Sequence, residues 1–168
     1  AGAQKNLGPA GTTLVIVKDE ILGHTCREIP TMLDYRTHIS KESMFNTPPV
    51  FPIYVSMLTL RWLKENGGIE WIEKRNNQKA DLLYNFIDTS PIFEGSAAIE
   101  DRSTMNATFL LTDNSLESEF NKMCLEGGIN GLKGHRSVGG YRASMYNALP
   151  LESVKVLVDV MKEFERTI

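Results

Sequence analysis

The sequence lacks the features that mark membrane, metal-binding and nucleic-acid-binding proteins. Its longest apolar run, residues 50–60, contains polar residues and a proline and is too short to span a bilayer. Among 168 residues there are only two cysteines and three histidines, and none has the spacing of a metal site. The net charge is −3, so no basic surface for nucleic acid is expected. With 42% hydrophobic residues, the chain has the composition of an ordinary globular domain.

The first residues also lack the features of a targeting segment. They form neither a basic nor an apolar run, so we expect no signal peptide. Few cysteines and no disulfide pattern fit a reducing compartment and predict a cytoplasmic protein. The chain opens without methionine on its most reactive-looking stretch, which predicts a fragment of a longer parent, cut just before Lys5.

The order of elements expected in the second half of the chain predicts a small α/β layer structure. The helix expected at 50–65 is apolar nearly all round, which indicates burial on most sides. The expected elements, in chain order, are a buried strand at 12–17, a helical turn at 19–24, a loop at 25–45, helices at 50–65 and 69–87, a loop at 91–102, a strand at 104–111, a helix at 116–125, short strands at 129–132 and 141–146, and a helix from 150.

Residues 1–11 place one lysine, Lys5, among glycine, proline and alanine. Such residues form tight turns and let the backbone approach a ligand closely. A lysine held there can attack an aldehyde once its ammonium loses a proton. The other interpretation is a surface lysine in a glycine-rich loop, and this stretch alone favours it.

Asn46 and Thr47 stand before two prolines, where the helix at 50–65 is expected to begin. Their amide and hydroxyl groups can cap that helix. They can also donate to an anion or phosphate, because helix N-termini bind anions well. The local sequence favours capping.

Residues 134–142 place two arginines, Arg136 and Arg142, and one histidine, His135, among three glycines. Arginine binds carboxylate or phosphate through two parallel hydrogen bonds, and histidine adds a further donor. The alternatives are an exposed basic loop and a structural ion pair, and the local sequence does not separate them from an anion site.

Together the three stretches, Ala-Gly-Ala-Gln-Lys-Asn, Met-Phe-Asn-Thr-Pro-Pro and Leu-Lys-Gly-His-Arg-Ser-Val-Gly-Gly-Tyr-Arg-Ala-Ser-Met-Tyr-Asn-Ala, resemble the class V aminotransferases, a family of pyridoxal-phosphate enzymes. The resemblance runs the whole length of the chain. It implies an α/β, aspartate-aminotransferase-like fold (fold type I), of which this chain is the C-terminal part. Residues 1–45 would end the large cofactor-binding domain with an edge strand, 46–66 would form a long linking helix, and 67–168 would form the small α/β domain.

The resemblance also implies how the cofactor is held. Lys5 matches the lysine that binds pyridoxal 5'-phosphate covalently and moves a proton between substrate and cofactor. Asn46 and Thr47 match the pair that binds the cofactor phosphate of the neighbouring subunit. A homodimer with a shared active site is therefore expected.

The substrate residues follow from the same resemblance. His135 and Arg136 match residues that bind the substrate phosphate, and Arg142 matches the arginine that holds the α-carboxylate. The implied reaction is amino transfer between glutamate and 3-phosphohydroxypyruvate, giving 2-oxoglutarate and phosphoserine for serine biosynthesis. The groups that hold the cofactor ring have no match in this chain, so the fragment alone is expected to be inactive.

Two other hypotheses stay open. The parent could be another class V member, such as an aminotransferase for a different small acid or a cysteine desulfurase. Assays of the parent with glutamate and several keto acids would separate these. The chain could also be a folded domain without catalysis, which an absorbance scan with added pyridoxal phosphate would reveal.

Overall fold

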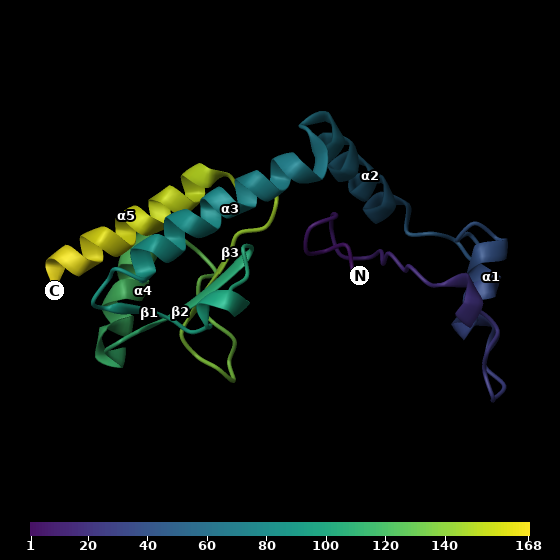
Figure 1. Ribbon diagram of the computed structural model, residues 1–168, viewed down its shortest axis with the longest axis horizontal. Coiled ribbons are helices and arrows are strands. Elements are labelled where there is room, and N and C mark those ends of the chain that lie inside the picture. The colour runs from purple at the N-terminus through teal and green to yellow at the C-terminus, as the bar shows by residue number, and fades with distance from the viewer. The chain divides into compact units, whose positions relative to one another are not determined.

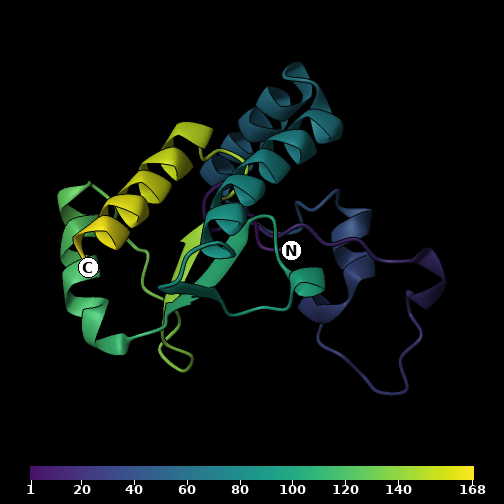
Figure 2. The same cartoon turned by 60° about the vertical axis from the view of Figure 1, so that its left-hand side comes forward.

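The computed structural model describes all residues, 1–168, and divides them into two compact units. The first unit is Ala1–Trp62 and the second is Leu63–Ile168. Figures 1 and 2 show the chain from two directions, and each unit is described by itself. No helix in the chain is long and apolar enough to cross a membrane.

The first unit holds short helices joined by extended segments. Two 3₁₀ turns, η1 (Asp19–Ile21) and η2 (Thr31–Leu33), precede the helix α1 (Tyr35–Ser40). The turn expected near residue 19 is confirmed, but α1 interrupts the loop expected at 25–45. A six-residue helix carries too little periodic pattern to be recognised in the sequence.

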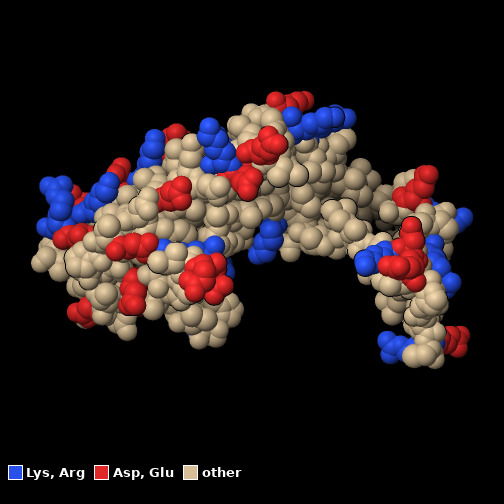
Figure 3. Space-filling view, in the orientation of Figure 1, with Lys and Arg blue, Asp and Glu red and all other residues tan.

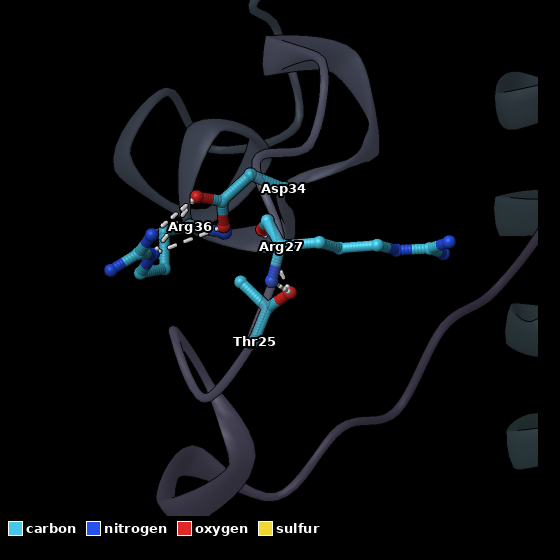
Figure 4. A network of polar contacts seen from close by, with 4 residues as sticks. All are labelled: Thr25, Arg27, Asp34 and Arg36. Atoms are coloured by element: carbon cyan, nitrogen blue, oxygen red, sulfur yellow. Dashed lines mark hydrogen bonds and ion pairs between the residues drawn. The ribbon is translucent and has the colours of Figure 1, made fainter.

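An ion pair at the start of α1 explains why this helix forms. The Asp34 side chain accepts a hydrogen bond from the Arg36 backbone N–H and so caps the helix. The Arg36 guanidinium also donates to both carboxylate oxygens, with Nη2 2.6 Å from Oδ2 (Figure 4). Hydrogen bonds from Arg36 lower the pKa of the Asp34 carboxyl. Nearby, Thr25 Oγ1 donates to the carbonyl oxygen of Arg27 at 3.0 Å and steadies the preceding loop.

The prediction of a buried strand at residues 12–17 is wrong. The segment forms one isolated bridge, Gly2 with Thr13, and no ladder beyond it. Leu14, Val15 and Ile16 are exposed, Ile16 to 90%, and Val17 is half-buried. Residues 1–3 pair with 12–14, where the Ala3 N–H donates to the Thr12 carbonyl and the Leu14 N–H donates to the Ala1 carbonyl. A strand needs a neighbour to pair its backbone groups, and no segment of this chain pairs with residues 15–17.

The long helix α2 (Val50–Glu65) begins and ends where the sequence predicts. Pro52 lies in its first turn, where a missing backbone N–H costs nothing. The predicted burial is wrong, because no residue of α2 is buried and Phe51 is 70% exposed. Much of the apolar surface of this helix is therefore uncovered in this chain, and its most covered residues are only half-buried.

The second unit is a three-stranded antiparallel sheet covered by helices. The strands β1 (Phe93–Gly95), β2 (Asn106–Leu111) and β3 (Tyr141–Ser144) lie in the order β1-β2-β3. The long helices α3 (Gly68–Ile87) and α5 (Leu151–Thr167) lie side by side across one face of the sheet (Figures 1 and 2). The helix α4 (Glu117–Glu126) packs against α5, and the 3₁₀ turns η3 (Ile99–Asp101) and η4 (Asn114–Leu116) complete the unit.

The core of this unit lies between the sheet and the helices. Burial alternates along β2, so its inward side chains are Ala107, Phe109 and Leu111. An aromatic cluster fills the centre, with the ring of Phe120 5.1 Å from that of Phe164. The periodic positions of α5 are buried as predicted, namely Val154, Leu157, Val158, Met161 and Phe164.

Most elements predicted for this unit are confirmed, including its three helices and the strands β2 and β3. Two predictions are wrong, because the loop expected at 91–102 contains β1 and residues 129–132 form no strand. β1 has only three residues, and its burial comes from pairing Phe93 with Leu111 on β2. On the surface, charged side chains of both signs are interspersed over α3 and α5 (Figure 3).

Candidate functional site

Lys5 lies at the tip of a closed loop in the first unit. The Ala3 backbone N–H donates to the Thr12 carbonyl at 3.0 Å, which joins the two ends of the loop. The Ala3 carbonyl accepts from the N–H groups of Leu7 at 3.0 Å and Gly8 at 2.9 Å, which forms a helical turn between them. Ala3 is buried and Lys5 is exposed. The turn therefore presents the Lys5 amine outward from a fixed backbone.

Two glycines of this loop approach the first turns of α2. A Cβ atom at Gly8 would lie 2.6 Å from Ser56 Oγ and 3.2 Å from Ser56 Cα. A Cβ atom at Gly11, where φ is +121°, would lie 2.8 Å from Pro52 Cγ. Only glycine fits these two contacts without a shift of the loop. The helix thus supports the turn that carries Lys5.

We expect Gly8→Ala to loosen this contact. Forcing a methyl group into a packed interface costs about 1–3 kcal/mol in the free energy of unfolding. Urea denaturation of the full-length protein measures this as a lower midpoint. Ser56→Ala is the matched control, because Ser56 Oγ is buried without a hydrogen-bond partner and its loss should cost little. An unchanged midpoint for Gly8→Ala would show that the loop does not depend on this contact.

Asn46 and Thr47 are exposed residues just before α2. The first helical turn is closed by the Ile53 N–H, which donates to the Pro49 carbonyl at 3.3 Å. No hydrogen bond joins the Asn46 or Thr47 side chain to the helix, so the capping favoured by the local sequence is wrong. Their amide and hydroxyl groups stay available to another acceptor, as an anion site requires.

His135 and Arg136 lie on a tight hairpin loop of the second unit. The Gly134 N–H donates to the Gly140 carbonyl at 2.7 Å and closes the loop. The His135 carbonyl accepts from the Gly139 N–H at 2.9 Å, and Gly139 has a φ of +78° that favours glycine. Both His135 and Arg136 are exposed. The backbone of the loop is therefore ordered while its cationic side chains face outward.

The ring of His135 is oriented by Ser137, which the sequence analysis missed. The Ser137 backbone N–H lies 3.3 Å from His135 Nδ1, and the Ser137 hydroxyl oxygen lies 2.7 Å from it. A backbone N–H can only donate, so Nδ1 is the acceptor and Nε2 carries the proton. His135 thus presents an N–H donor outward. The signal in the sequence was a hydroxyl residue two positions after a histidine.

Arg142 lies on β3, directly after this loop. Its backbone N–H donates to the Leu132 carbonyl at 2.7 Å, and its Cα partner on β2 is Thr108. Its neighbours Tyr141 and Ala143 are buried, so the alternation of the strand leaves the Arg142 side chain exposed. It lines an open pocket of about 460 Å³ that residues 127–132 and the start of α5 also border. A strand and a hairpin contact thus fix the backbone of this arginine.

The candidate residues form two groups according to the unit in which they lie. Lys5, Asn46 and Thr47 belong to the first unit, and Arg142 lies beside the loop of His135 and Arg136 in the second. The first group offers an amine and two neutral donors. The second offers two guanidinium groups and an imidazole N–H, which suit a substrate with two anionic ends.

Comparison with known proteins gives one consistent family. The class V aminotransferase profile matches residues 1–157. The chain is 69% identical over its whole length to the phosphoserine aminotransferase of Flavobacterium psychrophilum and covers 47% of that protein. It is 64% identical over 98% of its length to the corresponding protein of Flavobacterium johnsoniae and covers 46% of it. The chain therefore spans about half the length of these curated relatives.

Solved structures agree. A phosphoserine aminotransferase from Bacillus circulans subsp. alkalophilus matches 99% of the chain with a TM-score of 0.94 and 47% identity, and the match covers 46% of that protein. A pyridoxal-phosphate-bound phosphoserine aminotransferase from Trichomonas vaginalis matches 96% with a TM-score of 0.89 and 38% identity, covering 46% of that protein. The predicted fold class is confirmed by these matches.

Proposed function

The chain belongs to the class V aminotransferase family, and we propose that it is the C-terminal part of a phosphoserine aminotransferase. The parent protein would transfer an amino group between glutamate and 3-phosphohydroxypyruvate. The observation that carries this proposal is Lys5, exposed at the tip of a supported loop, in a chain 69% identical over its whole length to a relative of that name.

Pyridoxal phosphate fits donor groups of the first unit, which would come from the two subunits of the homodimer proposed below. The cofactor has an aldehyde and a phosphate, and when bound it supplies the electron sink of amino transfer. The Lys5 amine would hold the aldehyde covalently and then move a proton at the substrate α-carbon. The Asn46 amide and the Thr47 hydroxyl would donate to the phosphate oxygens, because no contact with the helix occupies them.

The cations of the second unit fit the two anionic ends of phosphoserine. Arg142 would bind the α-carboxylate, because its strand gives it a fixed backbone. Arg136 would bind the phosphate, and the Nε2–H of His135 would add a donor. The same pair would bind the side-chain carboxylate of glutamate in the other half of the reaction.

Burial removes Cys124 as a candidate for the reactive cysteine of a desulfurase, the alternative within the family. A desulfurase needs a reactive thiolate. Burial raises the pKa of the Cys124 thiol to about 11, so this group stays protonated at neutral pH. Both cysteines are free thiols, which also fits our proposal that the parent works in the cytoplasm.

The substrate assignment is tested by the full-length protein with glutamate and a panel of keto acids. We expect 3-phosphohydroxypyruvate to give the highest kcat/KM, with 2-oxoglutarate and phosphoserine as products. Pyruvate, oxaloacetate and glyoxylate serve as comparisons because each lacks the phosphate that Arg136 would bind. A higher kcat/KM for any of these three would assign the parent to another reaction of the family.

We further propose a homodimer in which Asn46 and Thr47 serve the partner's site. Mixing Asn46→Ala subunits with Lys5→Ala subunits tests this in the full-length protein. Random mixing makes about half of the dimers hybrids, and one site in each hybrid would be intact, so about a quarter of wild-type activity should return. The unmixed variants are the controls. Activity no higher than theirs would place Asn46 and Lys5 in one subunit's site.

A further inference from the structure

Lys79 is a buried cation of α3 that the proposed reaction does not use. Its exposure is 0%, and the other buried polar side chain of the chain, Asn76, lies one turn earlier. Its ammonium donates to three backbone carbonyls, those of Met145 at 3.0 Å, Tyr146 at 2.8 Å and Leu149 at 3.2 Å. Each proton of the ammonium thus has an acceptor, and no carboxylate pairs with it.

The three carbonyls belong to one short segment, residues 145–149, which joins β3 to α5. Asn76 holds the same segment, because its Nδ2 donates to Asn147 Oδ1 at 2.9 Å. The segment begins one residue after β3 ends, three residues after Arg142. On its other side the Met145 N–H donates to the Met105 carbonyl at 2.7 Å. Lys79 therefore fixes the end of the strand that carries Arg142.

Burying a lysine without a carboxylate is a costly way to stabilise a core. Burial, with a contribution from the Arg75 charge, lowers the pKa of the Lys79 ammonium to about 8, so the group still carries three protons for most of the time at neutral pH. Apolar side chains of similar volume often stabilise a core as well as buried charges do. What the three hydrogen bonds from Lys79 provide instead is a defined backbone geometry for residues 145–149.

We propose that Lys79 is a positioning residue, which fixes the backbone at the end of β3 so that Arg142 meets the substrate carboxylate in one orientation. This inference rests on the proposed role of Arg142. Four-residue strands at a sheet edge are weakly held by pairing alone, and β3 pairs with only one full strand, β2. The bonds from α3 secure the end of β3 that the hairpin does not reach.

The test measures binding of glutarate to the full-length protein loaded with cofactor. Glutarate is a dicarboxylate without an amino group, so its affinity reports carboxylate binding without turnover. Lys79→Met keeps an unbranched apolar stem and removes the three donors. We expect its Kd for glutarate to rise about tenfold, because small misplacements of a binding group have large effects. For glutamate we expect a higher KM with kcat within about twofold.

Two comparisons separate positioning from general stability. Leu83→Ala removes a fully buried side chain from the same helix and should destabilise the protein without changing the glutarate Kd. In an Arg142→Ala background, Lys79→Met should not raise the Kd for glutarate any further, because Lys79 acts through Arg142. If Lys79→Met does not fold, Lys79→Arg carries the test, since a planar guanidinium cannot serve three carbonyls around one nitrogen.

Each outcome decides between the two proposals. Suppose that Arg142→Ala raises the Kd for glutarate but the folded Lys79 variant binds glutarate like wild type. The positioning role of Lys79 is then wrong, and the role of Arg142 stands. If the Lys79 substitution weakens glutarate binding equally with and without Arg142, the positioning role is also wrong. If Arg142→Ala leaves the glutarate Kd unchanged, both the positioning role and the carboxylate site are wrong.

Discussion

Lys5→Ala in the full-length protein is expected to lower kcat about a thousandfold, in the range in which positioned acid–base groups contribute to catalysis. The substitution removes the amine that would hold the cofactor and move the substrate proton. It removes no contact of the loop, because the turn is held by the backbone of Ala3 and by Gly8 and Gly11 against α2. The loss should therefore appear in kcat and leave the unfolding midpoint of the cofactor-free protein unchanged.

Lys18→Ala is the control for this experiment. The Lys18 side chain is 80% exposed and forms one surface ion pair, with Glu20 at 3.6 Å. Exposed pairs of this kind contribute little to stability. We expect wild-type kcat for this variant in steady-state assays. A Lys5→Ala enzyme that retained more than about a tenth of wild-type kcat would remove Lys5 from the chemistry.

Arg142→Ala is expected to lower kcat/KM by one to two powers of ten for every amino acid substrate. A charge-assisted hydrogen bond contributes roughly 1.5–3 kcal/mol, and each amino acid brings an α-carboxylate. Phosphoserine, glutamate and alanine should therefore be impaired alike. Single-turnover changes in the cofactor absorbance measure each half-reaction separately.

Arg136→Ala is the matched comparison, because it also removes one exposed guanidinium from the same hairpin region. It should impair phosphoserine and glutamate but leave the slow alanine half-reaction nearly unchanged, since alanine has no distal anion. If Arg136→Ala slowed alanine as much as phosphoserine, the division of the substrate between the two arginines would be wrong.

The elements that could be predicted from the sequence are those with a long periodic pattern or a clear local end signal. α2 ends at a pair of glycines, and α5 repeats its apolar positions over four turns, so both helices were recognisable from the chain alone. β1 was missed because three residues hold no period, and its place depends on pairing with β2. The segment 12–17 has a strand-like composition, yet a composition cannot supply the neighbouring strand that pairing requires.

The site residues that could be predicted are those whose residue type alone indicates their chemistry. Lys5 and Arg142 were identified in this way, from residue type and neighbouring glycines and from the family resemblance. Lys79 was missed because a lysine in a helix normally faces water. Its signal was a gap in the apolar face of α3 between Ile72 and Leu83, which Lys79 and Asn76 fill with polar contacts to residues far along the chain.

The most direct test of the central claim, that Lys5 holds the cofactor, is borohydride reduction of the full-length protein with pyridoxal phosphate. Reduction fixes the cofactor to whichever amine holds it, and peptide mapping by mass spectrometry then locates that amine. We predict a single stoichiometric label on Lys5, lost in Lys5→Ala. A stoichiometric label on Lys18 or Lys133 in place of Lys5 would contradict it.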